Sequence, residues 1–369
     1  MTAVHTKLGE ICFVRRGTTI TKKQTIEGEV PVIGGGTKPT YFHNESNRKA
    51  NCITISGSGA SAGFVNKWDV PIFASDCSTV EPKDNTQLSE FIYYFLLSQQ
   101  EYIYKNFRSG AAQPHVYAKD IETLEYPILP ISEQQRIVAK LDAAFVEIDE
   151  AIENLETNKM NLKKLMDSTL ERFFNNEIYD EYELNEVCTF VGGSQPPKSE
   201  FEYEESENNI RLIQIRDYKS DNHIVYIPKD KARRFCTVDD VMIGRYGPPI
   251  FQILRGIEGA YNVALMKAIP KENILNDYLF YFLKNRRIQN FVINKSSRAA
   301  GQSGVNKDAL EPYIINLPPL ETQKEICEAS KQLELQAICL SNVYKKKLDN
   351  LMSLKSAILA QELQSSKAA

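Results

Sequence analysis

The chain has 369 residues, of which 42% are hydrophobic and 25% are charged, and its 44 Lys and Arg against 48 Asp and Glu give a formal net charge of −4. This length suits two or three domains, and the charge balance excludes a simple polybasic nucleic-acid coat, although a local basic face remains compatible with it. The absence of an apolar signal core after Met1 and of any run of 18 apolar residues argues against a secreted or membrane-spanning protein. Seven cysteines without a CxxC pair argue against a disulfide framework, so we expect a cytoplasmic protein with reduced thiols.

The glycines and prolines divide the chain into alternating segments. All of them lie within residues 9–130 and 192–319. Because Gly and Pro interrupt helices, this distribution predicts a mixed domain, a long helix, a second mixed domain and a second long helix, at residues 1–130, 131–176, 177–319 and 320–369. Short β-branched runs and an aromatic segment that suits a buried helix recur in both domains, which predicts an α+β fold with sheet and helices mixed.

The first predicted long helix has a start signal and an apolar seam. Ser132 can cap its N-terminus, and Gln135, three positions later, completes a capping box. Apolar residues then recur at alternating spacings of four and three, which is typical of a coiled coil. The seam that we assign consists of Leu141, Phe145, Ile148, Ile152, Leu155 and Leu162.

The second predicted long helix begins in the same way, with Thr322 and Glu325 at the capping-box spacing. Each helix carries one lysine within its seam, Lys159 or Lys347, so neither helix should be stable alone. We therefore expect the two helices to pack together as an antiparallel coiled coil; ordinary core packing of each helix is the alternative. The second seam that we assign consists of Leu333, Leu340, Tyr344, Leu351, Leu354 and Ile358.

The two halves of the chain repeat one another in sequence. Leu8-Gly9-Glu10-Ile11-Cys12 matches Leu184-Asn185-Glu186-Val187-Cys188, and both copies run on to a glycine, Gly17 or Gly193. Further matches stay in order along the chain: residues 52–59 with 240–247, 92–96 with 279–283, and 130–137 with 319–326. A tandem repeat of domain and helix predicts a pseudo-two-fold arrangement, in which one chain imitates the symmetric dimers that meet two DNA half-sites.

The order of these parts resembles the specificity subunit of type I restriction–modification enzymes over nearly the whole chain. The resemblance rests on the Leu8 and Leu184 segments, which open the two domains, and on Leu129-Pro130-Ile131-Ser132-Glu133-Gln134-Gln135-Arg136-Ile137 with its second copy from Leu317, which open the two helices. One departure is that Glu321-Thr322-Gln323 replaces Ser132-Glu133-Gln134. Another is that Arg245-Tyr246-Gly247 replaces Gly57-Ser58-Gly59, in loops that we expect to face DNA and that should differ between domains reading different sequences.

The resemblance implies a non-catalytic subunit with two target-recognition domains, each reading one part of a split site in double-stranded DNA. The helices would then serve as spacer and as docking surface for methylation subunits, two in number, with restriction subunits in the full complex. S-adenosylmethionine would be held by the methylation subunit, and this chain would bind no cofactor, metal or membrane.

The residues themselves also argue against an enzyme. The four histidines show no HxxxH or HxxE spacing, and the chain has no Walker loop, no GxGxxG and no Asn-Pro-Pro-aromatic motif of amino-methyltransferases. A self-contained methyltransferase–nuclease is therefore disfavoured. A coiled-coil interaction scaffold with two protein-binding domains remains the alternative.

Loops that combine small residues with basic, aromatic and amide side chains are the candidate DNA contacts. Arg and Lys suit guanine edges and phosphates, amides suit adenine, and small hydroxyls suit phosphate oxygens. For any one of these residues a solvated turn position is the alternative, and the repeated Gln113 and Gln302 could instead serve the fold. The candidates in the first half are Lys38, Tyr41, Ser56, Ser58, Ser61, Lys67, Arg108, Gln113, His115 and Tyr117. Those in the second half are Arg216, Lys219, Arg245, Tyr246, Arg298, Gln302, Ser303 and Asn306.

Overall fold

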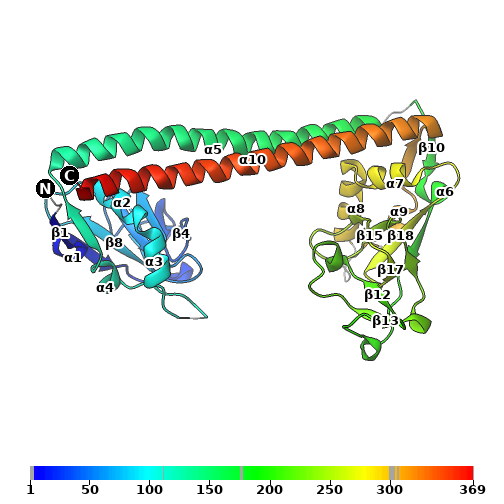
Figure 1. Cartoon of the computed structure of the whole chain (residues 1–369), viewed down its shortest axis with the longest axis horizontal. Helices are drawn as coiled ribbons and strands as arrows, with labels where there is room; N and C mark the ends of the chain where they lie inside the picture. The colour runs from blue at the N-terminus through cyan, green and yellow to red at the C-terminus, as the bar shows by residue number, and fades with distance from the viewer. Residues whose placement is uncertain (1–3, 111, 175–177, 299–303, 306, 369) are drawn as a thin grey trace. The chain divides into compact units, whose positions relative to one another are not determined.

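The computed structural model of the chain describes residues 4–110, 112–174, 178–298, 304–305 and 307–368, and Figure 1 traces its helices and strands. The chain forms two compact units, the first made of residues 1–156 and 345–369 and the second of residues 157–344. The long helices α5 (Ile131–Phe174) and α10 (Leu320–Ala368) each contribute to both units. In the described part of the chain, no helix is long and apolar enough to cross a membrane.

The first unit is built on short strands with helices packed against them. Its strands are β1 (Val4–Lys7), β2 (Cys12–Arg16), β3 (Val30–Ile33), β4 (Tyr41–His43), β5 (Cys52–Ser56), β6 (Val65–Trp68), β7 (Phe73–Ala74), β8 (Cys77–Pro82) and β9 (Glu125–Ile128). Its shorter helices are α1 (Leu8–Ile11), η1 (Lys22–Gln24), α2 (Ser89–Ser98), α3 (Gln100–Asn106) and α4 (Ala118–Ile121). An antiparallel sheet has the strand order β2-β8-β5-β6, a smaller sheet has the order β4-β3-β7 with β3 and β7 parallel, and β1 pairs with β9.

The second unit repeats this plan. Its strands are β10 (Asp180–Glu183), β11 (Cys188–Gly192), β12 (Asn209–Ile213), β13 (Tyr226–Pro228), β14 (Phe235–Cys236), β15 (Val241–Gly244), β16 (Gln252–Leu254), β17 (Gly259–Tyr261), β18 (Leu265–Pro270) and β19 (Ile314–Leu317). Its helices are α6 (Leu184–Val187), η2 (Lys198–Glu200), η3 (Ile215–Tyr218), η4 (Lys229–Lys231), α7 (Asn276–Leu283), α8 (Arg286–Arg298) and α9 (Lys307–Leu310). The sheets have the orders β11-β18-β15-β16, β13-β12-β17-β14 and β10-β19, which match the first unit strand by strand apart from the added β14. The predicted α+β fold and the tandem repeat are therefore confirmed.

The aromatic segments form the buried helices that the sequence predicts. Phe91 of α2 is fully buried in a core that also holds Ile53 of β5 and Leu141 of α5. Tyr278 of α7 is buried in the corresponding core with Val241 of β15. Because burying one large apolar side chain contributes roughly 1.5–3 kcal/mol, these clusters hold each domain against the helix that follows it.

The repeated glycine at the end of β2 and after β11 has a steric cause. A Cβ atom added to Gly17 would lie 2.2 Å from the carbonyl oxygen of Ser75, and one added to Gly193 would lie 1.9 Å from that of Asn262. Both distances are far inside van der Waals contact. Only glycine therefore allows the two backbone segments to approach at this point in either unit.

The long helices pair antiparallel inside each unit, as predicted. In the first unit Lys140 of α5 forms an ion pair of 2.6 Å with Glu362 of α10, and Asp149 forms one of 2.7 Å with Lys355, so numbers rise along one helix as they fall along the other. In the second unit the C-terminal Phe174 of α5 shares a core with Cys327, near the start of α10. The assigned seam residues other than Leu340 and Leu354 are buried or half-buried. They are Leu141, Phe145, Ile148, Ile152, Leu155, Leu162, Leu333, Tyr344, Leu351 and Ile358.

Two assigned seam residues of α10 are in the wrong position. Leu340 is 37% exposed and Leu354 is 48% exposed. The residues that follow them, Ser341 and Lys355, are the half-buried ones. Leu348, which follows the seam lysine Lys347, is half-buried as well. The assignment followed leucines at heptad spacing, whereas this side of the seam also uses small and polar residues, which carry no apolar signal.

Candidate nucleic-acid interface

Three loops of the first unit meet beyond the end of β5, and we call residues 34–40, 57–64, 108–110 and 112–117 together the first loop cluster. The backbone N–H of Gly59 donates to Pro114 O at 2.9 Å, and the N–H of Val116 donates to Gly57 O at 3.0 Å. Ser56 Oγ donates to Gly36 O at 3.0 Å. Loops that lie far apart in the sequence thus form one continuous surface.

Asp76 fixes the centre of this cluster, and sequence reasoning did not select it as a binding-site residue. Its carboxylate accepts a hydrogen bond from the Ser58 hydroxyl, and its backbone oxygen accepts one from the N–H of Gly57 at 3.0 Å. Asp76 carries negative charge, so it suits loop positioning and not phosphate contact. A selection of DNA contacts by basic and amide side chains could not have included Asp76.

Arg108 clamps two of the loops together. Its Nε donates to Ala62 O at 2.7 Å and its Nη2 to Ala60 O at 3.3 Å, and the guanidinium lies 3.9 Å above the ring of Tyr104. Charged donors make the stronger hydrogen bonds to carbonyls, so this one side chain holds the 57–64 turn against the segment that follows α3.

In the second unit an arginine also bonds two loops together, but it is Arg245, which lies in the loop equivalent to residues 57–64. The N–H of Val305 donates to Arg245 O at 3.0 Å, which reproduces the link from Val116 to Gly57. The Arg245 side chain then donates to Val305 O at 2.9 Å and to Val263 O at 3.1 Å, and it lies 5.3 Å from the ring centre of Tyr246. The second unit therefore repeats the link between two of these loops, with a different arginine side chain bonding them together.

The other candidates of the first half divide between surface and framework. Lys38, Gln113 and Tyr117 are exposed on the first loop cluster, and the half-buried His115 ring stacks on Tyr117 at 6.3 Å. Ser61 is half-buried in the 57–64 turn. The hydroxyl of Tyr41 donates to the carbonyl of Ile20, which ties β4 to the preceding loop.

Two candidates are corrected by their surroundings. Ser56 is only 4% exposed and its hydroxyl is used inside the fold, so it is a framework residue. Lys67 lies on β6, and its Nζ is 3.3 Å from carboxylate oxygens of both Asp69 and Glu90. Burial alone would lower the pKa of Lys67, but these two carboxylates raise it above its ordinary value. Its charge is therefore already paired, with two carboxylates that do not belong to the loop cluster.

The candidates of the second half lie partly outside the described residues. Arg216 is exposed and donates to His223 O at 3.2 Å, and the exposed Lys219 follows it. Both come soon after β12, as Lys38 comes soon after the equivalent β3. Arg298 is the last residue of α8. Gln302, Ser303 and Asn306 lie outside the described residues.

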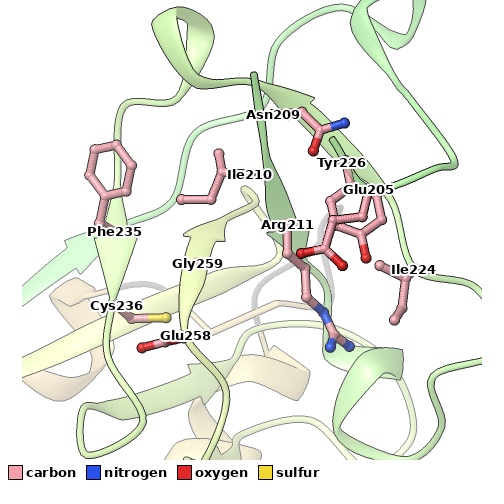
Figure 2. A pocket seen from close by; sticks show the side chains of 10 residues that line it. All are labelled: Glu205, Asn209, Ile210, Arg211, Ile224, Tyr226, Phe235, Cys236, Glu258 and Gly259. Atoms are coloured by element: carbon pink, nitrogen blue, oxygen red, sulfur yellow. The ribbon is translucent and has the colours of Figure 1, made fainter. Parts of the chain in front are cut away.

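A hollow of about 600 Å³ in the second unit has the wrong charge for a phosphate site. Figure 2 shows Arg211 and Tyr226 on one side of it and Phe235 on the other, with Glu205 and Glu258 also lining it. Arg211 is paired with Asp221 at 2.8 Å and lies 3.7 Å from the buried Asp217. Burial raises the pKa of Asp217 even though Arg211 opposes the shift. We therefore leave this hollow out of the candidate interface.

The described residues offer no metal centre, since no group of three His, Cys, Asp or Glu among them could hold an ion. The cysteines are free thiols, buried except for Cys339. Burial raises the pKa of the Cys12 and Cys188 thiols to about 12. Such thiols are poor nucleophiles and fit a packing role.

Comparison with known proteins gives one consistent family. A family model described as the type I restriction modification DNA specificity domain matches residues 3–158 and 176–350. The chain is 20% identical to the type I restriction enzyme EcoKI specificity subunit of Escherichia coli over 84% of this chain and 73% of that protein. It is 22% identical to the MjaVIII specificity subunit of Methanocaldococcus jannaschii over 77% of this chain and 72% of that protein.

Solved structures show the same fold. A chain from a type I R-M system, solved in work on its complex assembly and conformational transition, superposes with a TM-score of 0.77 at 18% identity, covering 98% of this chain and 97% of that one. The HsdS subunit from Thermoanaerobacter tengcongensis superposes with a TM-score of 0.52 at 18% identity, also over 98% and 97%. At these identities the likeness shows the fold alone.

Proposed function

We propose, because the chain belongs to the type I restriction–modification DNA specificity family, that it reads a two-part target in double-stranded DNA, one part with each domain. The observation that carries this proposal is the repeated loop cluster. Both units hold the same loops together by the same backbone link, Val116 to Gly57 and Val305 to Arg245, while the side chains around that link differ. A shared scaffold with different side chains suits two domains that read different base sequences.

The chain would contribute recognition, and its partners would contribute chemistry. Methylation subunits, two per chain, would hold S-adenosylmethionine, restriction subunits would join the full complex, and all would act in the cytoplasm with the DNA. Docking is supported by apolar side chains on the outer faces of the long helices. Val146 and Met352 in the first unit and Leu335 and Ile338 in the second are all exposed. Contiguous exposed apolar patches mark protein–protein contacts, and Leu335 and Ile338, three residues apart on α10, lie on one face of that helix.

A coiled-coil scaffold with two protein-binding domains is the competing function, and DNA binding separates the two. The full chain mixed with its methylation subunit should shift a duplex that carries the target and should shift an unrelated duplex much less. A complex that forms but binds both duplexes equally would favour the scaffold.

The two-part target is tested by exchange of one domain. Residues 1–130 are replaced by the corresponding block of a related subunit, and the methylated motif is read by sequencing the methylome of cells that carry the system. One half of the motif should change and the other should stay. A motif in which both halves change together would contradict the division of labour between the domains.

A further inference from the structure

A groove of about 500 Å³ in the first unit combines aromatic rings with carboxylates. It lies between α2 and α5, with Tyr93, Tyr94 and Phe145 contributing rings. The acidic lining residues are Asp142, Asp149, Glu150 and Glu153, and Lys355 of α10 is the one basic residue that lines it.

The groove keeps an excess of negative charge. Lys355 pairs with Asp149 at 2.7 Å and lies 4.5 Å above Phe145, and the Tyr94 hydroxyl donates to Asp142. Glu150 and Glu153 form no ion pair with the described residues. Aromatic faces and carboxylates together are the surroundings that an arginine or lysine side chain prefers.

The second unit repeats the two rings of this groove but not the carboxylates Asp149, Glu150 and Glu153, which are replaced by Ile338, Cys339 and Asn342. Phe280 and Tyr281 of α7 match Tyr93 and Tyr94 in sequence, and the Tyr281 hydroxyl again donates to a carboxylate of the long helix, Glu334, at 3.3 Å. Here the chain supplies its own cations. Arg255 lies 3.9 Å above Phe280, and Lys284 lies 4.7 Å above the same ring and 2.6 Å from Glu334.

The first copy is filled only in part, because its own Lys355 lies over Phe145 and pairs with Asp149. Lys67 stands where Arg255 stands in the repeat, and each pairs with the acid in the first turn of the next helix, but Leu97 replaces Lys284. Among the described residues no cation lies over the ring of Tyr93. The repeated pair of rings therefore carries two cations in the second unit, whereas in the first unit Lys355 covers Phe145 and leaves the ring of Tyr93 uncovered.

We infer that the open groove receives a basic side chain, arginine or lysine, of the methylation subunit. The inference rests on the proposed function, which supplies the partner, and it makes the two copies unequal: the first unit is completed by the partner, the second by its own Arg255 and Lys284. DNA is the wrong occupant, because phosphates would be repelled by the unpaired Glu150 and Glu153.

The test measures the Kd of the full chain for the methylation subunit encoded with it, by calorimetry at low and high salt. Glu150→Lys should weaken binding about tenfold or more, and Leu97→Lys, which copies the second unit, should weaken it in the same direction. The matched control is Glu147→Lys, the same charge reversal at an exposed position of α5 outside the groove, which should change Kd less than about twofold.

Thermal unfolding of each variant shows whether the fold is kept, and the exposed position of Glu150 makes that variant the decisive one. Equal affinities of wild type, Glu150→Lys and Glu147→Lys would overturn the inference. If the wild-type chain binds no methylation subunit at all, the proposed function fails and the inference falls with it. A loss of DNA affinity without a change in Kd for the methylation subunit would also contradict it.

Discussion

The side-chain oxygen Oε1 of Gln134, in the first turn of α5, accepts the backbone N–H of Leu88 at 2.9 Å, across 46 residues of sequence. In the second unit Oε1 of Gln323 accepts the N–H of Leu275 at 2.8 Å. Each amide nitrogen in turn donates to backbone carbonyls on both sides of the junction. Both glutamines are fully buried, so at each junction one buried side-chain amide bonds the end of the domain to the first turn of the helix that follows it.

Replacing Gln134 by Ala should therefore destabilise the first unit. The change leaves the N–H of Leu88, a half-buried residue, without its acceptor, and loss of such a hydrogen bond costs roughly 0.5–1.5 kcal/mol. Hydrogen exchange of the full chain should show loss of protection at the Leu88 amide, and urea unfolding should shift to lower concentration. Gln135→Ala removes an exposed amide from the same helix and is the matched control. Equal protection of Leu88 in both variants would contradict this role.

The close backbone approach at Gly193 gives a second prediction. Gly193→Ala would place a methyl group 1.9 Å from Asn262 O, and relief of that clash requires the strands to move apart. Overpacking of this kind costs roughly 1–3 kcal/mol. At the neighbouring Gly192 an added Cβ meets nothing within 4 Å, so Gly192→Ala is a control with the same chemical change. We expect the melting temperature to fall for Gly193→Ala and to stay nearly constant for Gly192→Ala. An equal fall in both variants would show that the clash with Asn262 O adds no destabilisation of its own.

The parts of this structure that follow a periodic pattern could be predicted from sequence. The apolar seam of α5 and the matched segments predicted the element order, the antiparallel pairing and the repeat. The two capping boxes were placed wrongly, because α5 begins at Ile131 and α10 at Leu320, so Ser132 and Thr322 lie inside the first helical turn and not at the N-cap. The seam of α10 could be predicted only where it is apolar. Leu340 and Leu354 were misplaced because Ser341 and Lys355 occupy seam positions without an apolar signal.

The candidate interface was predictable as a set of loops and not as a set of contacts. The sequence selects residues by chemical type, which cannot separate an exposed Lys38 from a Lys67 already paired with Asp69 and Glu90. The sequence also does not show that the guanidinium groups of Arg108 and Arg245 donate hydrogen bonds to backbone carbonyl oxygens. Apart from Asp69, which is close to Lys67 in sequence, the partners that decide these roles lie more than twenty residues away along the chain.

The thiols should differ sharply in reactivity. Cys339 is exposed, whereas burial raises the pKa of Cys52, Cys77 and Cys327 to about 12. Alkylation proceeds through the thiolate, so at pH 8 the native chain should be modified quickly at Cys339 and at the buried thiols only after unfolding. Mass spectrometry after brief exposure to iodoacetamide measures this, with Cys339→Ser as the control that should remain unmodified. Rapid modification of Cys77 in the folded chain would contradict its burial.

The last prediction separates Lys38 from Lys67 on DNA. Lys38 is exposed on the first loop cluster, where an unpaired ammonium can contact a phosphate and release a counterion. Lys38→Ala should therefore weaken binding to the target duplex several-fold and reduce the slope of log K against log salt by about 1. Lys67 is paired with Asp69 and Glu90, neither of which belongs to this cluster, so we expect Lys67→Ala to remove the same charge from the chain but no phosphate contact. We expect its salt slope to equal that of the wild type, measured by fluorescence anisotropy of a labelled target duplex with the full chain and its methylation subunit. A reduced slope for Lys67→Ala and an unchanged one for Lys38→Ala would place the DNA on the β6 side of the domain, and the first loop cluster would then not be the reading surface.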